Sequence, residues 1–330
     1  MIDLNSPEIQ FALQTVRRAT ILVRQVQAEM VTPALTKEDH SPVTIADYAS
    51  QAIVGFDLEK AFPAEPLVAE EDASVLRADE TRTTLEHVAG FVRKLVDHAT
   101  ALDVCDWIDR GQSESALRFW TLDPIDGTKG FLRGDQYAVA LALIQDGIVQ
   151  IGVLGCPNLA NAQEVSFKGE GLLVIGVRNQ GAWTTSLDNP GHFEPIKVSP
   201  FSSTVHARLL RSFESGHTNT DQIEAFAATL GVKTAPLLMD SQAKYAVLAA
   251  GKGDLMLRML SPARPNYREK IWDQSAGSIV LEEAGGKLTD LDGKALDFTT
   301  GRELVNNRGI LASNGHLHSA ALNAIREIGA

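Results

Sequence analysis

Two apolar runs on either side of Asp146-Gly147 constrain the fold of this chain more than any other feature of its sequence. The runs read YAVALALI and IVQIGVLG, and an Asp-Gly pair between two such runs is typical of a β-hairpin. The first run is apolar at almost every position, as an interior strand is. The sequence therefore predicts antiparallel strands near the middle of the chain.

Before this hairpin the sequence mixes helices with a short strand. Ser6 can cap a helix that has Pro7 at its first position, and apolar residues then recur at helical spacing as far as Val26. A second helix is predicted over residues 46–61, and the strand PLVA follows it. The polar stretch over residues 81–99 also has a helical pattern.

The second half of the sequence alternates strands with helices. The predicted strands are ARLLRSF, APLLM, DLMLRML and GILASN. The predicted helices are DQIEAFAATLG, SQAKYAVLAAG and DQSAGSIVLEEAGG, with a last helix at the end of the chain. This alternation favours an α/β arrangement.

A chain of 330 residues is long for one domain and sufficient for two. We expect an N-terminal α+β domain over residues 1–157, which carries most of the acidic residues discussed below. A C-terminal α/β domain is expected over residues 158–330. The boundary falls at Pro157 and Asn158, although a sheet that continued past them would blur it.

Charge and cysteine content limit the classes of function. The chain has 42 acidic and 30 basic residues, a net charge of −12, which disfavours a broad nucleic-acid surface but permits a small basic pocket for a phosphate. Its two cysteines, Cys105 and Cys156, have no zinc-binding spacing, so we expect a reducing cytoplasm and no disulfide framework. The sequence has neither a signal-peptide pattern nor an apolar stretch of about 18 residues, so we expect no membrane partner.

Two carboxylates, Asp123 and Asp126, lie three residues apart in LDPIDGT, before the hairpin. With 42 acids in 330 residues, about five pairs at this spacing arise by chance, and the segment also suits a plain surface turn. Asp47, Glu70 and Asp273 lie near other predicted strand ends and helix starts, where α/β folds gather their ligands. Five carboxylates suit two or three magnesium ions and a phosphate, because ions about 4 Å apart repel and need compensating charge.

Four segments, in this order, resemble the magnesium-dependent, lithium-sensitive phosphatases of the inositol monophosphatase superfamily. They are SPVTIADYASQ, VAEED, DPIDGTKGF and WDQSAGSIVLEEAGG, and the resemblance covers residues 36–285. It implies the α/β (α+β) sugar-phosphatase fold. That fold is a layered α/β/α/β/α sandwich of an antiparallel-sheet domain and a smaller α/β domain.

The resemblance also implies a role for each acid. The implied magnesium ligands are Glu70, Asp123, Asp126, Asp273 and the backbone carbonyl of Ile125. Asp47 and Thr128 would form the catalytic pair that orients and activates the attacking water. Gly127 would let the backbone turn tightly enough for Thr128 to approach the phosphate. Two or three Mg²⁺ ions are the expected cofactor.

Within the superfamily, the segments SFESGHTNTD and MDSQAKYAVLAAGKGDLMLRM are most similar to the 3′(2′),5′-bisphosphate nucleotidases. This similarity implies removal of the 3′-phosphate of adenosine 3′,5′-bisphosphate to give AMP, and action on 3′-phosphoadenylyl sulfate. The implied substrate contacts are Thr128, His217, Ser241, Lys244, Arg258 and Asp273. His217 would pack against adenine, while Lys244 and Arg258 would bind the phosphate that the metals do not hold.

Two other functions remain open. One is an inositol mono- or polyphosphate phosphatase with the same metal chemistry, and the other is a catalytically silent nucleotide-binding regulatory protein that keeps the fold. Four residues have plainer interpretations: His217 as a solvated loop residue, Ser241 as a helix cap, Lys244 as an exposed helix lysine and Arg258 as a charge on an edge strand. The expected partner is a small-molecule substrate, without nucleic acid.

Overall fold

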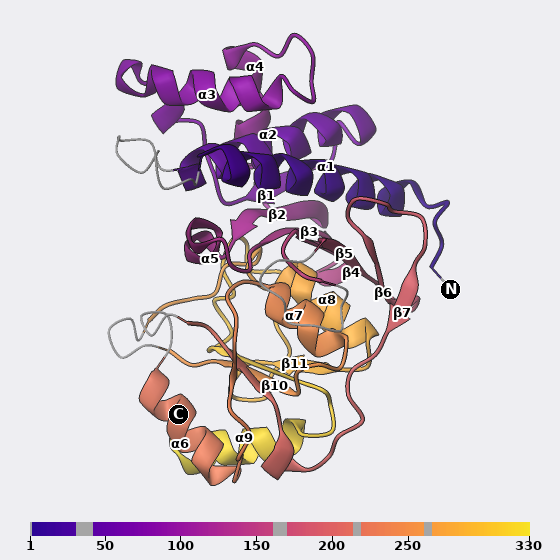
Figure 1. Cartoon of the computed structure of the whole chain (residues 1–330), viewed down its shortest axis with the longest axis vertical. Coiled ribbons are helices and arrows are strands. Elements are labelled where there is room, and N and C mark those ends of the chain that lie inside the picture. The colour runs from indigo at the N-terminus through magenta and orange to yellow at the C-terminus, as the bar shows by residue number, and fades with distance from the viewer. Residues whose placement is uncertain (1, 31–41, 161–169, 214–218, 261–265) are drawn as a thin grey trace.

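The computed structural model describes residues 2–30, 42–160, 170–213, 219–260 and 266–330. Within these ranges, layers of helices alternate with layers of sheet along the long axis of the molecule (Figure 1). The α/β fold and the expected α/β/α/β/α order of layers are thereby confirmed.

The first sheet has seven strands, paired in the order of the chain. They are β1 (Leu67–Ala69), β2 (Arg118–Asp126), β3 (Ala138–Gln145), β4 (Ile148–Cys156), β5 (Leu172–Val177), β6 (Gly181–Ser186) and β7 (Glu194–Ile196). β1 pairs in parallel with β2, and each later neighbour is antiparallel. The predicted hairpin is β3–β4, with φ of 52° at Asp146 and 74° at Gly147, as a type I′ turn requires.

This sheet continues beyond Pro157. β5 pairs with β4, and β6 and β7 follow in turn, so backbone hydrogen bonding crosses the boundary expected at residues 157–158. The division of the chain into domains at that point stays a prediction.

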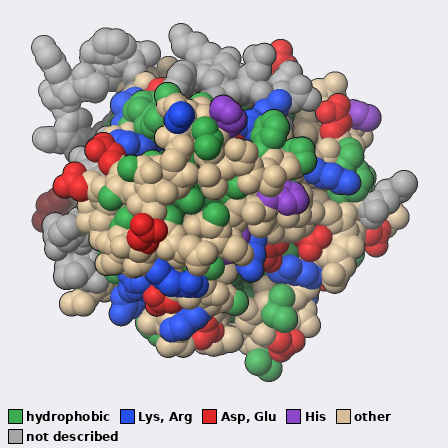
Figure 2. Space-filling model, turned by 90° about the horizontal axis from the view of Figure 1, so that it is seen from below, with side chains coloured by type: hydrophobic (Ala, Val, Ile, Leu, Met, Phe, Trp, Pro, Cys, Tyr) green, Lys and Arg blue, Asp and Glu red, His purple; other side chains and the backbone are tan. Residues whose placement is uncertain are grey.

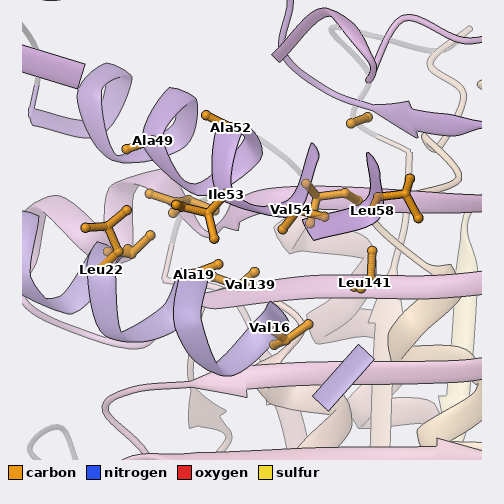
Figure 3. Close-up of a cluster of buried hydrophobic side chains, with 14 of the residues drawn as sticks. Val16, Ala19, Leu22, Ala49, Ala52, Ile53, Val54, Leu58, Val139 and Leu141 are labelled. Carbon is orange, nitrogen blue, oxygen red and sulfur yellow. The ribbon is translucent and has the colours of Figure 1, made fainter. Parts of the chain in front are cut away.

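Two long helices, α1 (Pro7–Met30) and α2 (Pro42–Ala61), cover one face of the first sheet. Figure 3 shows apolar side chains of both helices, among them Val16 and Ile53, gathered over Val139 of β3. Removal of this apolar surface from water holds the helices on the sheet. α1 begins at the predicted proline, whereas α2 begins four residues earlier than predicted.

Two further helices, α3 (Arg82–Val92) and α4 (Ala101–Asp109), pack against α2 on the side away from the sheet (Figure 1). The helix predicted over residues 81–99 is therefore shorter than expected. The sequence interpretation missed α4, although Thr100 and Asp103 form a capping box at its start. Asp103 N donates to Thr100 Oγ1 (3.1 Å), and Thr100 N donates to the Asp103 carboxylate (2.9 Å).

The second sheet has the strand order β11-β12-β10-β8-β9. Its strands are β8 (Leu209–Arg211), β9 (Leu237–Leu238), β10 (Leu255–Arg258), β11 (Lys287–Thr289) and β12 (Ile310–Ser313). The remaining elements are α5 (Thr128–Arg133), α6 (Thr220–Thr229), α7 (Ala243–Ala249), α8 (Ser275–Glu283), α9 (His318–Glu327), η1 (Val75–Arg77), η2 (Asp79–Thr81) and η3 (Thr204–His206). The alternation predicted four of these strands and the helices α6 to α9, and it missed the short β11.

α6 and α9 pack against each other on the outer face of the second sheet. Figure 2 shows the molecule from that end, where acidic and basic side chains are interspersed. Across the described ranges, no helix has the length and apolar character needed to cross a membrane.

α7 and α8 fill the layer between the two sheets, and α8 lies directly on the first sheet (Figure 1). Gly152 of β4 and Gly176 of β5 are paired at this contact. A Cβ atom at Gly152 would lie 2.6 Å from the carbonyl oxygen of Ala276, and one at Gly176 would lie 2.7 Å from the Cα of Val280. The absence of side chains at both glycines therefore lets α8 approach the sheet closely.

We expect Gly152→Ala to lower the free energy of unfolding by about 2–3 kcal/mol, because the added methyl group overlaps the α8 backbone. Gly90→Ala is the matched control, since nothing lies within 4 Å of a Cβ added there. In helix α3 that change should be neutral or stabilise by up to about 1 kcal/mol. Urea unfolding monitored by circular dichroism measures both, and a Gly152→Ala variant as stable as the wild type would contradict the close packing.

His318, the first residue of α9, is 1% exposed and lies between two hydroxyl groups. Nδ1 is 2.8 Å from Ser313 Oγ, and Nε2 is 3.0 Å from Thr289 Oγ1. Thr289 donates its own hydrogen to the carbonyl of Asp290 (2.8 Å), so its oxygen accepts from Nε2–H of the ring. Burial, and then the charge of Lys287, lower the pKa of His318 to about 4.

Because the unfolded chain binds this proton near pH 6.5, the folded protein should lose stability as the pH falls from about 6.5 to about 4. A His318→Gln variant cannot titrate, so it should lose less stability than the wild type over that interval. Urea unfolding of both proteins near pH 7.5 and near pH 5 checks this. Identical pH dependence in the two proteins would show that His318 is not responsible.

Candidate active site

A cavity of about 430 Å³ lies where the end of β2, the start of α7, the strand β10 and the start of α8 meet. Nine of the predicted site residues line it: Glu70, Asp123, Ile125, Asp126, Thr128, Ser241, Lys244, Arg258 and Asp273. Asp47 does not belong to this lining, and His217 lies outside the described residues. Residues far apart in the sequence are thus brought together as the sequence predicted.

Asp123 and Asp126 do not lie on a plain surface turn. Both belong to β2, and Asp123 is 2% exposed. The β2–β3 register shifts between the two acids, around Pro124, whose carbonyl accepts a hydrogen bond from Ser50 Oγ (3.0 Å). This irregularity turns the end of the strand, because Pro124 has no N–H to contribute to the ladder.

Gly127 joins this strand to α5 with φ of 91°, in the left-handed region that favours glycine. A Cβ atom at Gly127 would lie 2.7 Å from the Cβ of Ser241, so two loops of the cavity wall meet at this glycine. Thr128 follows as the first residue of α5 and is exposed at the cavity. The tight turn predicted at Gly127 is present.

The helix α2 supports the site through the backbone next to Glu70. Asp47 is 6% exposed and lies beyond the first turn of α2, not at the helix start as predicted. One turn later, Gln51 accepts from Glu71 N (3.1 Å) and donates to Glu71 O (2.6 Å), which fixes the backbone next to Glu70. No hydrogen bond joins Asp47 to Thr128 in the part of the chain that the structure describes, so their pairing stays a prediction.

Gln242 is a buried residue of this site that sequence reasoning missed. Its backbone N–H donates to Asp126 Oδ2 (2.6 Å), its Nε2 donates to Trp272 O (3.0 Å), and its Oε1 accepts from Gly277 N (3.0 Å). It therefore links β2, the residue before Asp273 and the first turn of α8. A glutamine does not take part in the carboxylate spacing that indicates metal ligands. The only sequence signal for Gln242 was its place in the segment SQAKY.

Ser241 precedes Gln242 in a left-handed conformation, with φ of 67°. Its Oγ accepts from N of Ala243, the first residue of α7 (3.2 Å), while it lines the cavity. The N-cap residue of α7 is Gln242, so Ser241 makes a local contact next to the helix start and is not the cap itself. A non-glycine residue with positive φ is a strained conformation that the surrounding contacts must hold.

Two of the predicted site residues at this cavity are cations, Lys244 and Arg258. Lys244 Nζ donates to Ser212 Oγ (3.2 Å), and the side chain is partly buried, so it is not a free surface lysine. Arg258 Nε lies 3.0 Å from Glu269 Oε1, and Arg258 Nη1 lies 3.8 Å from Asp273 Oδ2. The interpretation of Arg258 as an edge-strand charge is wrong, because β10 lies between β12 and β8.

The carboxylates of the cavity raise one another's pKa. Burial, followed by the charges of Glu70 and Asp126, raises the pKa of Asp123 well above its ordinary value. Desolvation and the charges of Glu71 and Asp126 raise the pKa of Glu70 to about 7. For Asp273, burial raises the pKa, although Arg258 opposes this effect. Negative charge is therefore costly in this cavity, and a bound cation would stabilise it.

These residues fit a hard divalent cation. Asp123 Oδ1 is buried and has no hydrogen-bond partner, and the donors in the cavity are carboxylate oxygens, which Mg²⁺ prefers. Within the described ranges, no three His, Cys, Asp or Glu side chains are already arranged to hold an ion.

Similarity to known proteins agrees with the fold. The description "inositol monophosphatase family" belongs to a family model that matches residues 4–330. A 3′(2′),5′-bisphosphate nucleotidase of Schizosaccharomyces pombe is 43% identical, over 93% of this chain and 91% of that protein. One from Oryza sativa is 40% identical, over 97% of this chain and 94% of that protein.

Among solved structures, an inositol monophosphatase from Zymomonas mobilis superposes with a TM-score of 0.65 at 21% identity, over 98% of this chain and all of that one. An inositol monophosphatase from Anabaena gives a TM-score of 0.62 at 22% identity, over 96% of this chain and 94% of that one. These two likenesses show a shared fold. Since the family model covers almost the whole sequence, the chain belongs to the inositol monophosphatase family.

Proposed function

We propose that this protein is a magnesium-dependent phosphatase that converts adenosine 3′,5′-bisphosphate into AMP and phosphate, and that it also acts on 3′-phosphoadenylyl sulfate. The observation that carries the proposal is the presence of an acidic zone and a cationic zone in one cavity. The acidic zone consists of the four carboxylates of Glu70, Asp123, Asp126 and Asp273. Lys244 and Arg258 form the cationic zone. The names of the nucleotidases of Schizosaccharomyces pombe and Oryza sativa support this substrate, and the family generally depends on magnesium.

The acidic zone would hold the cations. Glu70, Asp123, Asp126, Asp273 and the carbonyl of Ile125 are the proposed ligands of two or three Mg²⁺ ions. Bound there, magnesium would supply positive charge that stabilises the phosphoryl group in the transition state and lowers the pKa of a nearby water.

The chain's own groups would position the water and the substrate. Thr128 would accept a hydrogen bond from the attacking water while it donates to Asp47, which requires these two side chains to approach each other in the complex. Attack forms a bond from the water oxygen to phosphorus, and the bond between phosphorus and the 3′-oxygen breaks. Lys244 and Arg258 would bind the 5′-phosphate, and His217 is proposed to pack against adenine.

The first test is phosphate release from adenosine 3′,5′-bisphosphate, inositol 1-phosphate and inositol 1,4-bisphosphate, each with and without magnesium. We expect release that depends on magnesium and favours the nucleotide, because the cationic zone provides for a second phosphate. Preference for an inositol phosphate would overturn the proposed substrate and leave the acidic zone intact. No release from any of them would favour a silent nucleotide-binding protein.

Asp126→Asn should reduce kcat by about a thousandfold or more, because it removes one charge of the acidic zone, which is worth several kcal/mol in such sites. Asparagine keeps the shape and can still accept from Gln242 N, so the fold should persist. Asp146→Asn is the control, since that acid is exposed in the β3–β4 turn and Asn-Gly suits the same turn. Calorimetric titration with magnesium should show weaker binding for Asp126→Asn alone, and near-normal turnover by that variant would refute its role.

A further inference from the structure

Glu269 lies at the cavity, four residues before Asp273, and is 3% exposed. Its Oε2 accepts from Gln274 Nε2 (2.9 Å), and Gln274 Oε1 accepts from the hydroxyl of Tyr245 (2.6 Å). Tyr245 lies on α7 between the two sheets, so this chain of contacts anchors one carboxylate oxygen in the protein interior.

The other oxygen of Glu269 faces Arg258. Glu269 Oε1 and Arg258 Nε are 3.0 Å apart, an ion pair whose alignment does not make a hydrogen bond. On the other side, Arg258 Nη2 donates to the hydroxyl of Tyr267 (3.2 Å). The guanidinium is therefore located between Glu269 and Tyr267, with Nη1 3.8 Å from Asp273 and beyond hydrogen-bonding distance.

The guanidinium of Arg258 lies beside the acidic zone, so Asp273 competes with Glu269 as its partner. Paired, nearly planar contacts between Arg and carboxylate are strongly favoured, so Arg258 without another partner would move onto Asp273. That movement would neutralise a proposed metal ligand and withdraw a cation from the substrate. Burial alone would lower the pKa of Arg258, but Glu269 and Asp273 outweigh it and raise the pKa, so the group stays charged.

We propose that Glu269 is a positioning residue that holds Arg258 away from Asp273 and directs it to the second phosphate of a bisphosphate substrate. Glu269 then determines selectivity for a bisphosphate over a monophosphate without contact with the reacting atoms. This inference rests on the proposed function, which supplies the second phosphate.

Glu269→Gln tests the inference, because glutamine keeps the size and loses the charge. For adenosine 3′,5′-bisphosphate we expect KM to rise about tenfold, as for one weakened charge-assisted contact, while any fall in kcat from neutralisation of Asp273 should be equal for this substrate and for adenosine 3′-monophosphate. For adenosine 3′-monophosphate, which lacks the second phosphate, KM should change by less than about twofold. An equal rise in KM for both substrates, or no rise for either, would overturn the inference.

Glu65→Gln is the matched control. Glu65 Oε1 accepts from Arg118 Nε (2.8 Å), and its Oε2 accepts from Trp120 Nε1 (2.6 Å), so Glu65 also pairs one oxygen with an arginine and anchors the other, but it lies away from the cavity. This variant should leave the ratio of the two KM values unchanged. A comparable shift with Glu65→Gln would mean that the ratio reports general loss of an ion pair.

Binding without turnover separates this inference from the proposed function. Calorimetry should show that Glu269→Gln binds AMP about tenfold more weakly than the wild type and binds adenosine with unchanged affinity. A wild type that hydrolyses neither substrate would end the proposed function, while the AMP comparison would still decide the role of Glu269. If Glu269→Gln does not fold, Tyr245→Phe is the second variant, because it removes the hydroxyl that holds Gln274. It should shift the ratio of the KM values for the bisphosphate and the monophosphate by about two- to threefold. An unchanged ratio would count against the inference.

Discussion

Carboxylates that share one cavity repel one another, and their neighbours have to hold them together. The pKa of Asp123 is raised by burial and by Glu70 and Asp126, which means that folding gathers charge in a place where charge is poorly solvated. The stabilising contacts lie elsewhere. Apolar clusters on both faces of the first sheet and on the outer face of the second sheet fix the three segments that carry the acids.

Neutral groups make many of the contacts that position the acidic zone. Gln242 holds Asp126 through a backbone N–H, Ser50 holds the carbonyl of Pro124, and Gln51 holds the backbone next to Glu70. A lysine or arginine at position 51 could not accept from Glu71 N, and its charge would also neutralise the carboxylates. Neutral groups therefore fix the geometry of the acidic zone and leave its charge for a cation.

The sequence predicted the acids of this site better than the residues that position them. Charge, a Pro-x-Asp-Gly turn and a resemblance identified the acids at β2 and before α8, and the Asp-Gly pair identified the β3–β4 hairpin. Gln242 and Glu269 have roles that depend on which segments meet in space, so no local pattern predicted them. The need for glycine at positions 152 and 176 could not be predicted from the sequence either, because only the approach of α8 shows why a side chain would not fit there. The start of α4 does have a local signal, the capping box of Thr100 and Asp103, which the sequence interpretation missed.

One short helix relates the two charge zones of the cavity. At the start of α7, Gln242 N donates to Asp126 of the acidic zone, and two residues later comes Lys244 of the cationic zone, whose Nζ donates to Ser212 Oγ. Because helical residues rise by only about 1.5 Å each, this start sets the distance between the zones with little freedom. The strained Ser241 and the glycine at position 127 pack against each other and fix where the helix begins. A substrate with two phosphates has to match that distance, so the start of α7 would set the spacing of the two phosphates, while Glu269 would set the place of Arg258.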